Sequence, residues 1–204
     1  MVYLVLDGPD GGGKSTQSRA LVDFLRRRGR TVHHLREPGS TPVGENLRQL
    51  LLSPQTGDLQ PLTEVLLFTA ARAELAARVI GPALSRGEDV VSERCFASTL
   101  AYQCLATNPG VPFDLVLDLT RRAHGPWMPD AVFVLDCDVA TALRRRASRQ
   151  KDRIEGRDEA FHERVRSAYL EVARRDPTFC VVDSRWPFAS VQATLQQRAL
   201  RFLQ

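Results

Sequence analysis

One segment near the start of the chain restricts the fold more than any other feature. Residues 8–15 read GPDGGGKS, which matches the pattern GxxxxGK followed by Ser or Thr, and they directly follow an apolar segment that ends at Asp7. A helical pattern begins after them, so the glycine-rich segment joins a strand to a helix. In this position backbone N–H groups and the helix N-terminus converge on an anion. The motif predicts a phosphate-binding loop, and a glycine-rich turn without a ligand is the alternative.

Two residues of this motif carry its chemistry. Lys14 is expected to reach the β- and γ-phosphates of a nucleotide, and the Ser15 hydroxyl to ligate Mg²⁺. Among the 28 lysine and arginine residues, only Lys14 and Lys151 are lysine. The chain therefore uses arginine at nearly every basic position. Because a compact ammonium and a planar guanidinium are not interchangeable at a tight phosphate site, a lysine retained in such a chain indicates a chemical role. Chance retention of two lysines is the alternative.

Short apolar segments alternate with helical patterns along the chain, which is typical of βαβ units around a parallel sheet. Strands are expected at residues 2–6, 31–35, 89–92, 131–135 and 179–182. Helices are expected at residues 14–28, 43–52, 62–85, 96–106, 113–124, 139–149, 159–174 and 188–203. Residues 36–41 and 149–157 are expected to be mobile loops. The second loop is rich in both charges, so it is either a solvated surface or a lid over the substrate.

Length and composition exclude several classes of protein. With 204 residues, 43% of them hydrophobic and 25% charged, the chain fits one soluble globular domain. No apolar segment approaches the roughly 18 residues of a membrane span, and Asp7 interrupts the N-terminal one, so we expect no membrane association, no signal peptide and a cytoplasmic location. The net charge of +4 is spread along the chain without an aromatic and basic signature, which favours a small anionic ligand over a nucleic acid. The cysteines and histidines lack metal-ligand spacing, so we expect reduced cysteines and no zinc.

Polar residues follow the predicted strands where these end. In a parallel sheet the strand ends meet at one edge, where ligands bind. We therefore expect the following residues to converge near the phosphate-binding loop: Asp7, Arg36, Glu37, Glu93, Arg94, Asp136 and Asp138.

The predicted helix at residues 62–85 has one face with an arginine in its middle, formed by Val65, Phe68, Arg72, Leu75 and Val79. Phe68 and Arg72 lie one turn apart, a separation suited to stacking a base and holding its phosphate. The alternative is that Phe68 is a core residue and Arg72 extends to solvent, and spacing alone slightly favours it.

Several segments together resemble the bacterial thymidylate kinases, a family of P-loop nucleoside monophosphate kinases. They occur in the family's order and span nearly the whole chain: GPDGGGKST at residues 8–16, REPGST at 36–41, LLFTAAR ending at Arg72, SERCFASTLAYQ at 92–103, PDAVFVLD ending at Asp136, and DRIE at 152–155. The resemblance implies a P-loop NTPase fold, an α/β domain with a five-stranded parallel sheet flanked by helices over residues 1–204, with a short lid at about 149–157. It also implies a homodimer.

The activity that the resemblance implies is transfer of the ATP γ-phosphoryl group to dTMP, giving dTDP and ADP for dTTP synthesis, with Mg²⁺ present. The ATP-binding residues would be Gly8, Pro9, Asp10, Gly11, Gly12, Gly13, Lys14, Ser15 and Thr16. Another nucleotide or deoxynucleoside kinase, or a catalytically impaired nucleotide-binding homologue, is the alternative, since a fold alone does not set the acceptor. A regulatory GTPase is disfavoured because no NKxD-like motif occurs.

The resemblance also implies roles toward dTMP. Asp10 would hold the 3′-hydroxyl, Phe68 would stack on thymine, Thr99 would face the base edge and Tyr102 would crowd the sugar. Arg72 and Arg94 would grip the acceptor phosphate with Arg36 beside it, and Ser98 and Gln103 complete the predicted dTMP-binding set. The metal-binding set would be Ser15, Glu93 through water, Asp152 and Glu155.

Catalysis requires positive charge near the transferring phosphoryl group rather than an acid or base, because the acceptor oxygen is already anionic. Lys14 and Arg94 would supply part of it. Some family members carry an arginine inside the phosphate-binding loop, but its variable positions carry no cation here. The lid segment contains Arg149, Lys151 and Arg153 and resembles the lids of members that use a lid arginine instead, which implies that a lid arginine supplies the rest. Arg153 is the first choice because it lies within DRIE, and Arg149 is the second.

The chain departs from the family pattern at two adjoining positions. Family members usually carry Asp-Arg followed by an aromatic residue or His, whereas this chain has Glu93, Arg94 and Cys95. Glu93 keeps a carboxylate but extends it by one methylene. Because Cys95 adjoins Arg94, we predict a lowered thiol pKa and sensitivity to oxidation.

Overall fold

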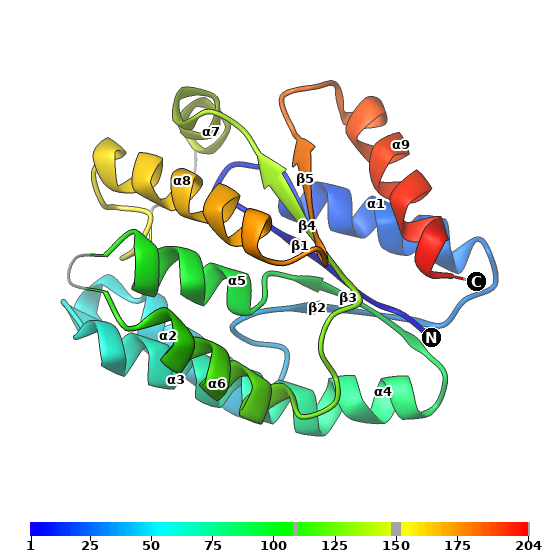
Figure 1. Ribbon diagram of the computed structural model, residues 1–204, viewed down its shortest axis with the longest axis horizontal. Helices are drawn as coiled ribbons and strands as arrows, with labels where there is room; N and C mark the ends of the chain where they lie inside the picture. Colours follow the sequence, from blue (N-terminus) through cyan, green and yellow to red (C-terminus); the bar gives the residue numbers. More distant parts are fainter. Residues whose placement is uncertain (108–109, 148–151, 204) are drawn as a thin grey trace.

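The computed structural model describes residues 1–107, 110–147 and 152–203 and is built around one parallel sheet (Figure 1). The strands lie in the order β2-β3-β1-β4-β5, with bounds β1 (Tyr3–Asp7), β2 (Val32–Arg36), β3 (Asp89–Glu93), β4 (Ala131–Asp136) and β5 (Phe179–Asp183). The chain passes to one side of β1 to form β2 and β3, and to the other side for β4 and β5. The direction therefore reverses at β1, where open α/β sheets bind ligands.

The strand register brings the polar strand ends together. Leu6 of β1 pairs with Glu93 of β3, and Glu93 pairs in turn with Arg36 of β2. On the other side of β1, Asp7 pairs with Val134 of β4. The parallel pairing itself thus places the polar ends of β1, β2 and β3 at one edge. Asp136 and Asp138, also expected near the phosphate-binding loop, have other partners: Asp136 accepts from Arg166 Nε and Asp138 from the Thr141 N–H, both at 2.7 Å.

Helices cover both faces of the sheet (Figure 1). They are α1 (Lys14–Arg26), α2 (Pro42–Leu52), α3 (Pro61–Leu75), α4 (Gly81–Ser85), α5 (Phe96–Thr99), α6 (Phe113–His124), α7 (Val139–Arg146), α8 (Glu159–Arg175) and α9 (Phe188–Ala199). Leu4 and Leu6 of β1 pack in one core cluster with α1 and α9, while Tyr3 and Val5 pack in the other cluster with α3, α6 and α8. Because both faces are covered, the central strands β1 and β4 are apolar on both sides up to their final Asp. Among the described residues, no helix is long and apolar enough to cross a membrane.

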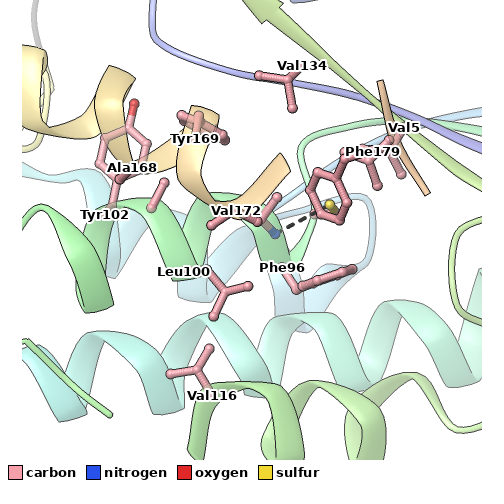
Figure 2. Packing of buried hydrophobic residues seen from close by; sticks show 14 of the residues in the cluster. Val5, Phe96, Leu100, Tyr102, Val116, Val134, Ala168, Tyr169, Val172 and Phe179 are labelled. Atoms are coloured by element: carbon pink, nitrogen blue, oxygen red, sulfur yellow. Dashed lines mark hydrogen bonds between the residues drawn. The ribbon is translucent and has the colours of Figure 1, made fainter. Parts of the chain in front are cut away.

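The larger core cluster fixes the segment that follows β3 (Figure 2). Phe96 meets Phe179 edge to face, with ring centroids 5.9 Å apart, and Tyr102 meets Tyr169 at 6.1 Å in the same manner. The Cys95 sulfur, which is fully buried, accepts a hydrogen bond from the Ala97 N–H at 3.4 Å, drawn as the dashed line. The segment therefore leaves the sheet in a fixed direction.

The surroundings of Cys95 show that the predicted lowering of its thiol pKa is wrong. Burial raises the pKa of Cys95 well above its usual value, and the carboxylates of Asp7 and Glu37 add to the effect. Arg94 has a positive φ of 70°, so the chain turns directly after β3. Arg94 therefore reaches the edge of the sheet, whereas Cys95 enters the core.

The predicted strands are confirmed to within one residue, and the helices are mostly confirmed. Two predicted helices contain π-helical turns, at Ala76–Ile80 and Leu100–Leu105. In the first, Pro82 lacks an N–H, and the Gly81 N–H bonds to Ala76 O, five residues back. The helix predicted at 139–149 ends at Arg146, with 148–151 outside the described residues, and α9 ends at Ala199 before a 3₁₀ turn at Leu200–Phe202. The lid prediction is only partly described, from residue 152 onward.

Candidate active site

A cavity of about 530 Å³ opens at the edge of the sheet where β1, β2 and β3 end. Its walls come from the loop after β1, the end of β2, helix α2, Phe68 of α3, the segment after β3, the end of α7, part of the lid segment and the β5–α9 loop. This volume is typical of a small-molecule site. Residues from the whole length of the chain therefore meet in one place.

The phosphate-binding loop has the geometry that its glycines predict. Gly8 and Gly11 have positive φ angles of 126° and 86°. A Cβ at Gly8 would lie 2.6 Å from Leu135 O, and one at Gly11 would lie 2.5 Å from Ala142 O, so only glycine fits. Helix α1 begins at Lys14 immediately after the loop. The N-terminus of a thirteen-residue helix thus faces the cavity.

Lys14 is folded back onto its own loop. Its Nζ donates to Gly8 O at 2.9 Å and to Pro9 O at 2.8 Å. Burial lowers the pKa of Lys14 to about 8, and the nearby Arg94 charge contributes. The ammonium is therefore placed among carbonyl groups that an incoming phosphate can replace as its partners.

Arg94 links the loop to the rest of the cavity. Its Nη2 donates to Asp10 of the loop, and its Nη1 donates to Ser98 Oγ at 3.0 Å and to the Tyr169 hydroxyl at 3.2 Å. The Tyr102 hydroxyl donates to Asp10 Oδ2 at 2.7 Å. Burial raises the pKa of Asp10, but the charges of Arg94 and Lys14 outweigh it and hold that pKa well below its usual value.

Asp7 anchors this arrangement, a role that the sequence reasoning did not assign. Its carboxylate accepts from the N–H groups of Gly8 at 2.8 Å, Cys95 at 3.1 Å and Ser98 at 3.1 Å, and from the Tyr169 hydroxyl at 2.7 Å. Arg94, between these groups, has a positive φ of 70°, which costs a non-glycine residue about 1–3 kcal/mol. The position of Asp7 at the end of a buried strand was the available signal.

Ser15 and Glu93 form an oxygen-rich pair beside the loop. Ser15 Oγ donates to Glu93 Oε2 at 2.5 Å. The described residues contain no group of three or more His, Cys, Asp or Glu side chains suited to a metal. A hydroxyl and a carboxylate next to a phosphate site nevertheless fit Mg²⁺, which usually takes one or two protein oxygens and completes its shell with water and phosphates. Asp152 and Glu155 also line the cavity, and Asp152 Oδ1 accepts from the N–H groups of Ile154 and Glu155, both at 2.9 Å.

Phe68 lines the cavity and packs against the core, whereas Arg72 of the same face is only 2% exposed. Arg72 Nε donates to Glu37 Oε2 at 2.8 Å, and its Nη2 donates to Thr99 Oγ1 at 3.2 Å. Burial raises the pKa of Glu37 despite this ion pair. The alternative in which Arg72 extends to solvent is therefore wrong.

The remaining residues that were predicted to bind dTMP lie around the same cavity. Gln103 lines the cavity and donates to Glu64 Oε2 at 2.8 Å. Arg36 also lines the cavity, with a half-exposed side chain that pairs with Glu45 at 2.9 Å. Arg48 of α2, which the sequence reasoning did not select, lies beside them and donates to Pro38 O at 2.9 Å.

The two arginines expected in the lid have different outcomes. Arg149 lies outside the described residues. Arg153 turns toward α2 and α3: its Nε donates to Leu51 O at 3.0 Å and its Nη2 to Glu64 Oε1 at 2.6 Å. The described lid residues that line the cavity are Asp152, Ile154 and Glu155.

Arg145 and Arg146, at the end of α7, line the cavity and were missed. The Arg146 side chain is 5% exposed, and its Nε and Nη1 have no hydrogen-bond partner among the described residues. Trp186 of the β5–α9 loop and Phe188, the first residue of α9, also line the cavity, although they are 64% and 50% exposed. The run of three arginines after β4 and the aromatic pair after β5 were the signals in the sequence.

Comparisons with known proteins agree with this geometry. Residues 6–195 match the family model described as thymidylate kinase. The chain is 39% identical to the thymidylate kinase of Deinococcus radiodurans over 95% of this chain and 94% of that protein. It is 41% identical to the thymidylate kinase of Desulfosudis oleivorans over 93% of this chain and 92% of that protein. The crystal structure of thymidylate kinase from Ehrlichia chaffeensis is similar with a TM-score of 0.79 at 27% identity, covering 98% of both chains.

Proposed function

The chain belongs to the thymidylate kinase family and is an ATP-dependent phosphotransferase that converts dTMP to dTDP; we propose that this transfer takes place in the cavity, with ATP on residues 8–16 and dTMP beside Phe68. The observation that carries the proposal is the position of Arg94. Its guanidinium joins the phosphate-binding loop, through Asp10, to the space bounded by Phe68 and Ser98. A cation in that position faces both nucleotides.

The acceptor nucleotide is recognised by an aromatic face and by polar groups at its edge. Phe68 stacks on the base, while Gln103 and Thr99 face its polar edge. Arg94 and Arg36, which line the cavity, would bind the acceptor phosphate. Arg72 was also expected at this phosphate, but it is not among the described residues that line the cavity; because it donates to Thr99, we place its guanidinium at the base edge instead. Asp10 receives the sugar hydroxyl, and the Tyr102 ring that it binds narrows the space around the sugar.

The donor nucleotide occupies the other half of the cavity. Its phosphates bind the N–H groups of the loop and Lys14, which exchanges the carbonyls of Gly8 and Pro9 for them. Trp186 and Phe188 offer exposed aromatic surface for the donor base.

Ser15 and Glu93 would hold Mg²⁺, Glu93 through water. When bound, the ion neutralises charge on the phosphates that it contacts. Asp152 and Glu155 would contact its waters from the lid segment.

The chemical step requires neutralisation of charge, because both reacting groups are anionic. Lys14 and Arg94 act from the loop and from the β3 end. We propose Arg146 as the third cation. A buried guanidinium with unpartnered N–H groups is costly, so an anionic phosphoryl group that supplies the missing acceptors is stabilised there. No covalent nucleophile is required.

The test is a coupled assay of ADP formation with dTMP, dUMP, dCMP and dGMP as acceptors. We expect dTMP to give the highest kcat/KM. Lys14→Ala, verified as folded by circular dichroism, should lower kcat about a hundredfold or more, because the lost interaction strengthens as charge shifts in the transition state. If dTMP is no better than the other nucleotides, the acceptor assignment fails, and if Lys14→Ala keeps its turnover, the loop assignment fails.

We also propose a homodimer and a cytoplasmic location. Leu62 and Leu66 of α3 and Leu115 of α6 are large apolar side chains that are 47%, 49% and 41% exposed, on helices that lie side by side (Figure 1). Such a patch is typical of a protein interface. Light scattering should therefore give twice the 22.8 kDa mass of the chain. All four cysteines are unpaired, as is usual in a reducing compartment.

A further inference from the structure

The Glu93 carboxylate is bound from three directions. Its Oε2 accepts from Ser15 Oγ at 2.5 Å, and its Oε1 accepts from Ser18 Oγ at 3.0 Å. The third contact comes from His34 of β2, whose Nε2 lies 3.2 Å from Glu93 Oε1 and 3.0 Å from Ser18 Oγ. Ser15 and Ser18 lie one turn apart on α1, so two helical hydroxyls and one strand imidazole meet at the end of β3.

The contacts form a consistent network when His34 carries its proton on Nε2. Ser18 Oγ then donates to Glu93 Oε1, and the imidazole N–H donates to that oxygen and to Ser18 Oγ. A carboxylate accepts hydrogen bonds through both oxygens, so Glu93 can take all three bonds at once.

The fixed carboxylate determines how Ser15 presents its oxygen. A serine hydroxyl has one proton and two lone pairs. Because Ser15 donates its proton to Glu93, its lone pairs remain free for a cation in the cavity. Glu has one more rotatable bond than Asp, so its carboxylate loses more conformational freedom when it is fixed. A hydrogen-bond partner that fixes Glu93 Oε1 is therefore more important here than it would be for the shorter side chain of Asp.

We propose that His34 is a positioning residue for Mg²⁺ binding: with Ser18 it fixes the Glu93 carboxylate, and Glu93 in turn orients the Ser15 hydroxyl toward the metal. The proposal rests on the proposed function, in which Ser15 and Glu93 serve Mg²⁺. His34 itself does not contact the nucleotides, since it is not among the described residues that line the cavity.

The chain offers a matched set of variants. His34→Leu removes the donor, and His34→Gln keeps an N–H donor at a similar reach. His33→Leu is the control, because His33 is the next residue on the same strand and its Nε2 pairs with Glu88 at 2.7 Å instead. If His34→Leu does not fold, His34→Asn replaces it, since Asn has a donor that falls short of Glu93.

The readout is calorimetric binding of ADP with and without Mg²⁺, which involves no turnover. We expect His34→Leu to weaken the Mg²⁺-dependent part of ADP affinity roughly tenfold, as is typical when a partner of a metal-binding group is lost. ADP binding without Mg²⁺ should be unchanged, His34→Gln should recover most of the loss, and His33→Leu should match wild type. Equal losses with and without Mg²⁺, or no rescue by Gln, would overturn the positioning role.

Ser15→Ala separates this proposal from the proposed function. If Ser15→Ala loses the Mg²⁺-dependent affinity and His34→Leu keeps it, only the role of His34 fails. If Ser15→Ala also keeps it, the metal assignment of Ser15 fails, and the positioning role fails with it. The coupled dTMP assay tests the kinase activity independently of both outcomes.

Discussion

Removal of the Arg153 side chain is expected to reduce stability rather than catalysis. Arg153 and Glu64 form an ion pair whose side chains are 7% and 3% exposed. Removal of one partner of a buried pair costs about 3–5 kcal/mol because the other charge is left without compensation. Without the Arg153 side chain, Glu64 still accepts a hydrogen bond from the Gln103 amide at 2.8 Å and has Arg157 Nη2 at 3.8 Å. We therefore expect Arg153→Ala to lower the free energy of unfolding by about 3 kcal/mol, the lower end of this range.

For a chain of this length, 1 kcal/mol shifts the melting temperature by about 2–4 °C, so the expected decrease is roughly 6–12 °C. Thermal unfolding followed by circular dichroism measures it. Glu64→Gln should destabilise similarly, because it leaves Arg153 as the unpaired charge. The double variant Glu64→Leu with Arg153→Met should lose less than the sum of the single changes, since an apolar pair of similar volume needs no partner.

Steady-state kinetics at 25 °C, where the variants are folded, complete the comparison. Arg153→Ala should keep most of its kcat, whereas Arg146→Ala should lose about 10³-fold in kcat with little change in melting temperature or KM. A thousandfold loss of kcat in Arg153→Ala with an unchanged melting temperature would refute the structural role of Arg153. Wild-type turnover in Arg146→Ala would refute its assignment to the transferring phosphoryl group.

Three further outcomes are expected. Burial and the Arg72 charge lower the pKa of His124 to about 3, below its value of 6.5 in the unfolded chain, so the unfolded chain binds more protons between these two pH values. The free energy of unfolding should therefore fall by up to about 1.4 kcal/mol per pH unit below pH 6.5. In urea unfolding experiments, the stability of His124→Gln should depend less on pH. Phe68→Ala should raise the KM for dTMP about tenfold or more and leave the KM for ATP nearly unchanged, because the stacking, worth about 1–3 kcal/mol, involves only the acceptor base. Equal changes in both KM values would show that Phe68 is a core residue. Since Cys95 is buried with a raised pKa, mild peroxide should not label it in the folded protein, and mass spectrometry that finds Cys95 oxidised ahead of Cys104 would contradict this.

Local patterns predicted those parts of the molecule whose structure depends on neighbouring residues in the sequence. The strands were located to within one residue because each is a short apolar segment between polar ends, and the phosphate-binding loop was located because its glycines are required by backbone geometry. The π-helical turns were missed because Ala76–Ile80 and Leu100–Leu105 keep the apolar spacing of an ordinary helix. Hydrophobic periodicity does not record which carbonyl accepts each N–H.

The direction of charged side chains was the part that the sequence could not provide. The DRIE segment placed Arg153 in the lid, but the orientation of its guanidinium depends on Glu64, 89 residues away along the chain. Arg146 was overlooked because it stands in a run of three arginines, which a sequence does not distinguish from a solvated helix end. Only the packing of α7 against the cavity separates Arg146 from Arg144, which is exposed.

The three residues at 93–95 show how one short segment serves three parts of the molecule. Glu93 ends β3 in register with Leu6, and its carboxylate turns toward α1 and Ser15. The positive φ of Arg94 then changes the chain direction, so that its guanidinium reaches Asp10 and the following Cys95 enters the core. Because the Asp7 carboxylate at the end of the adjacent strand binds the Cys95 N–H, the strained turn is fixed by the pairing of β1 with β3. The positions of the Ser15 hydroxyl, which we propose binds Mg²⁺, and of the Arg94 guanidinium, which we propose binds phosphate, are therefore not independent: a change in the β1–β3 edge would displace both.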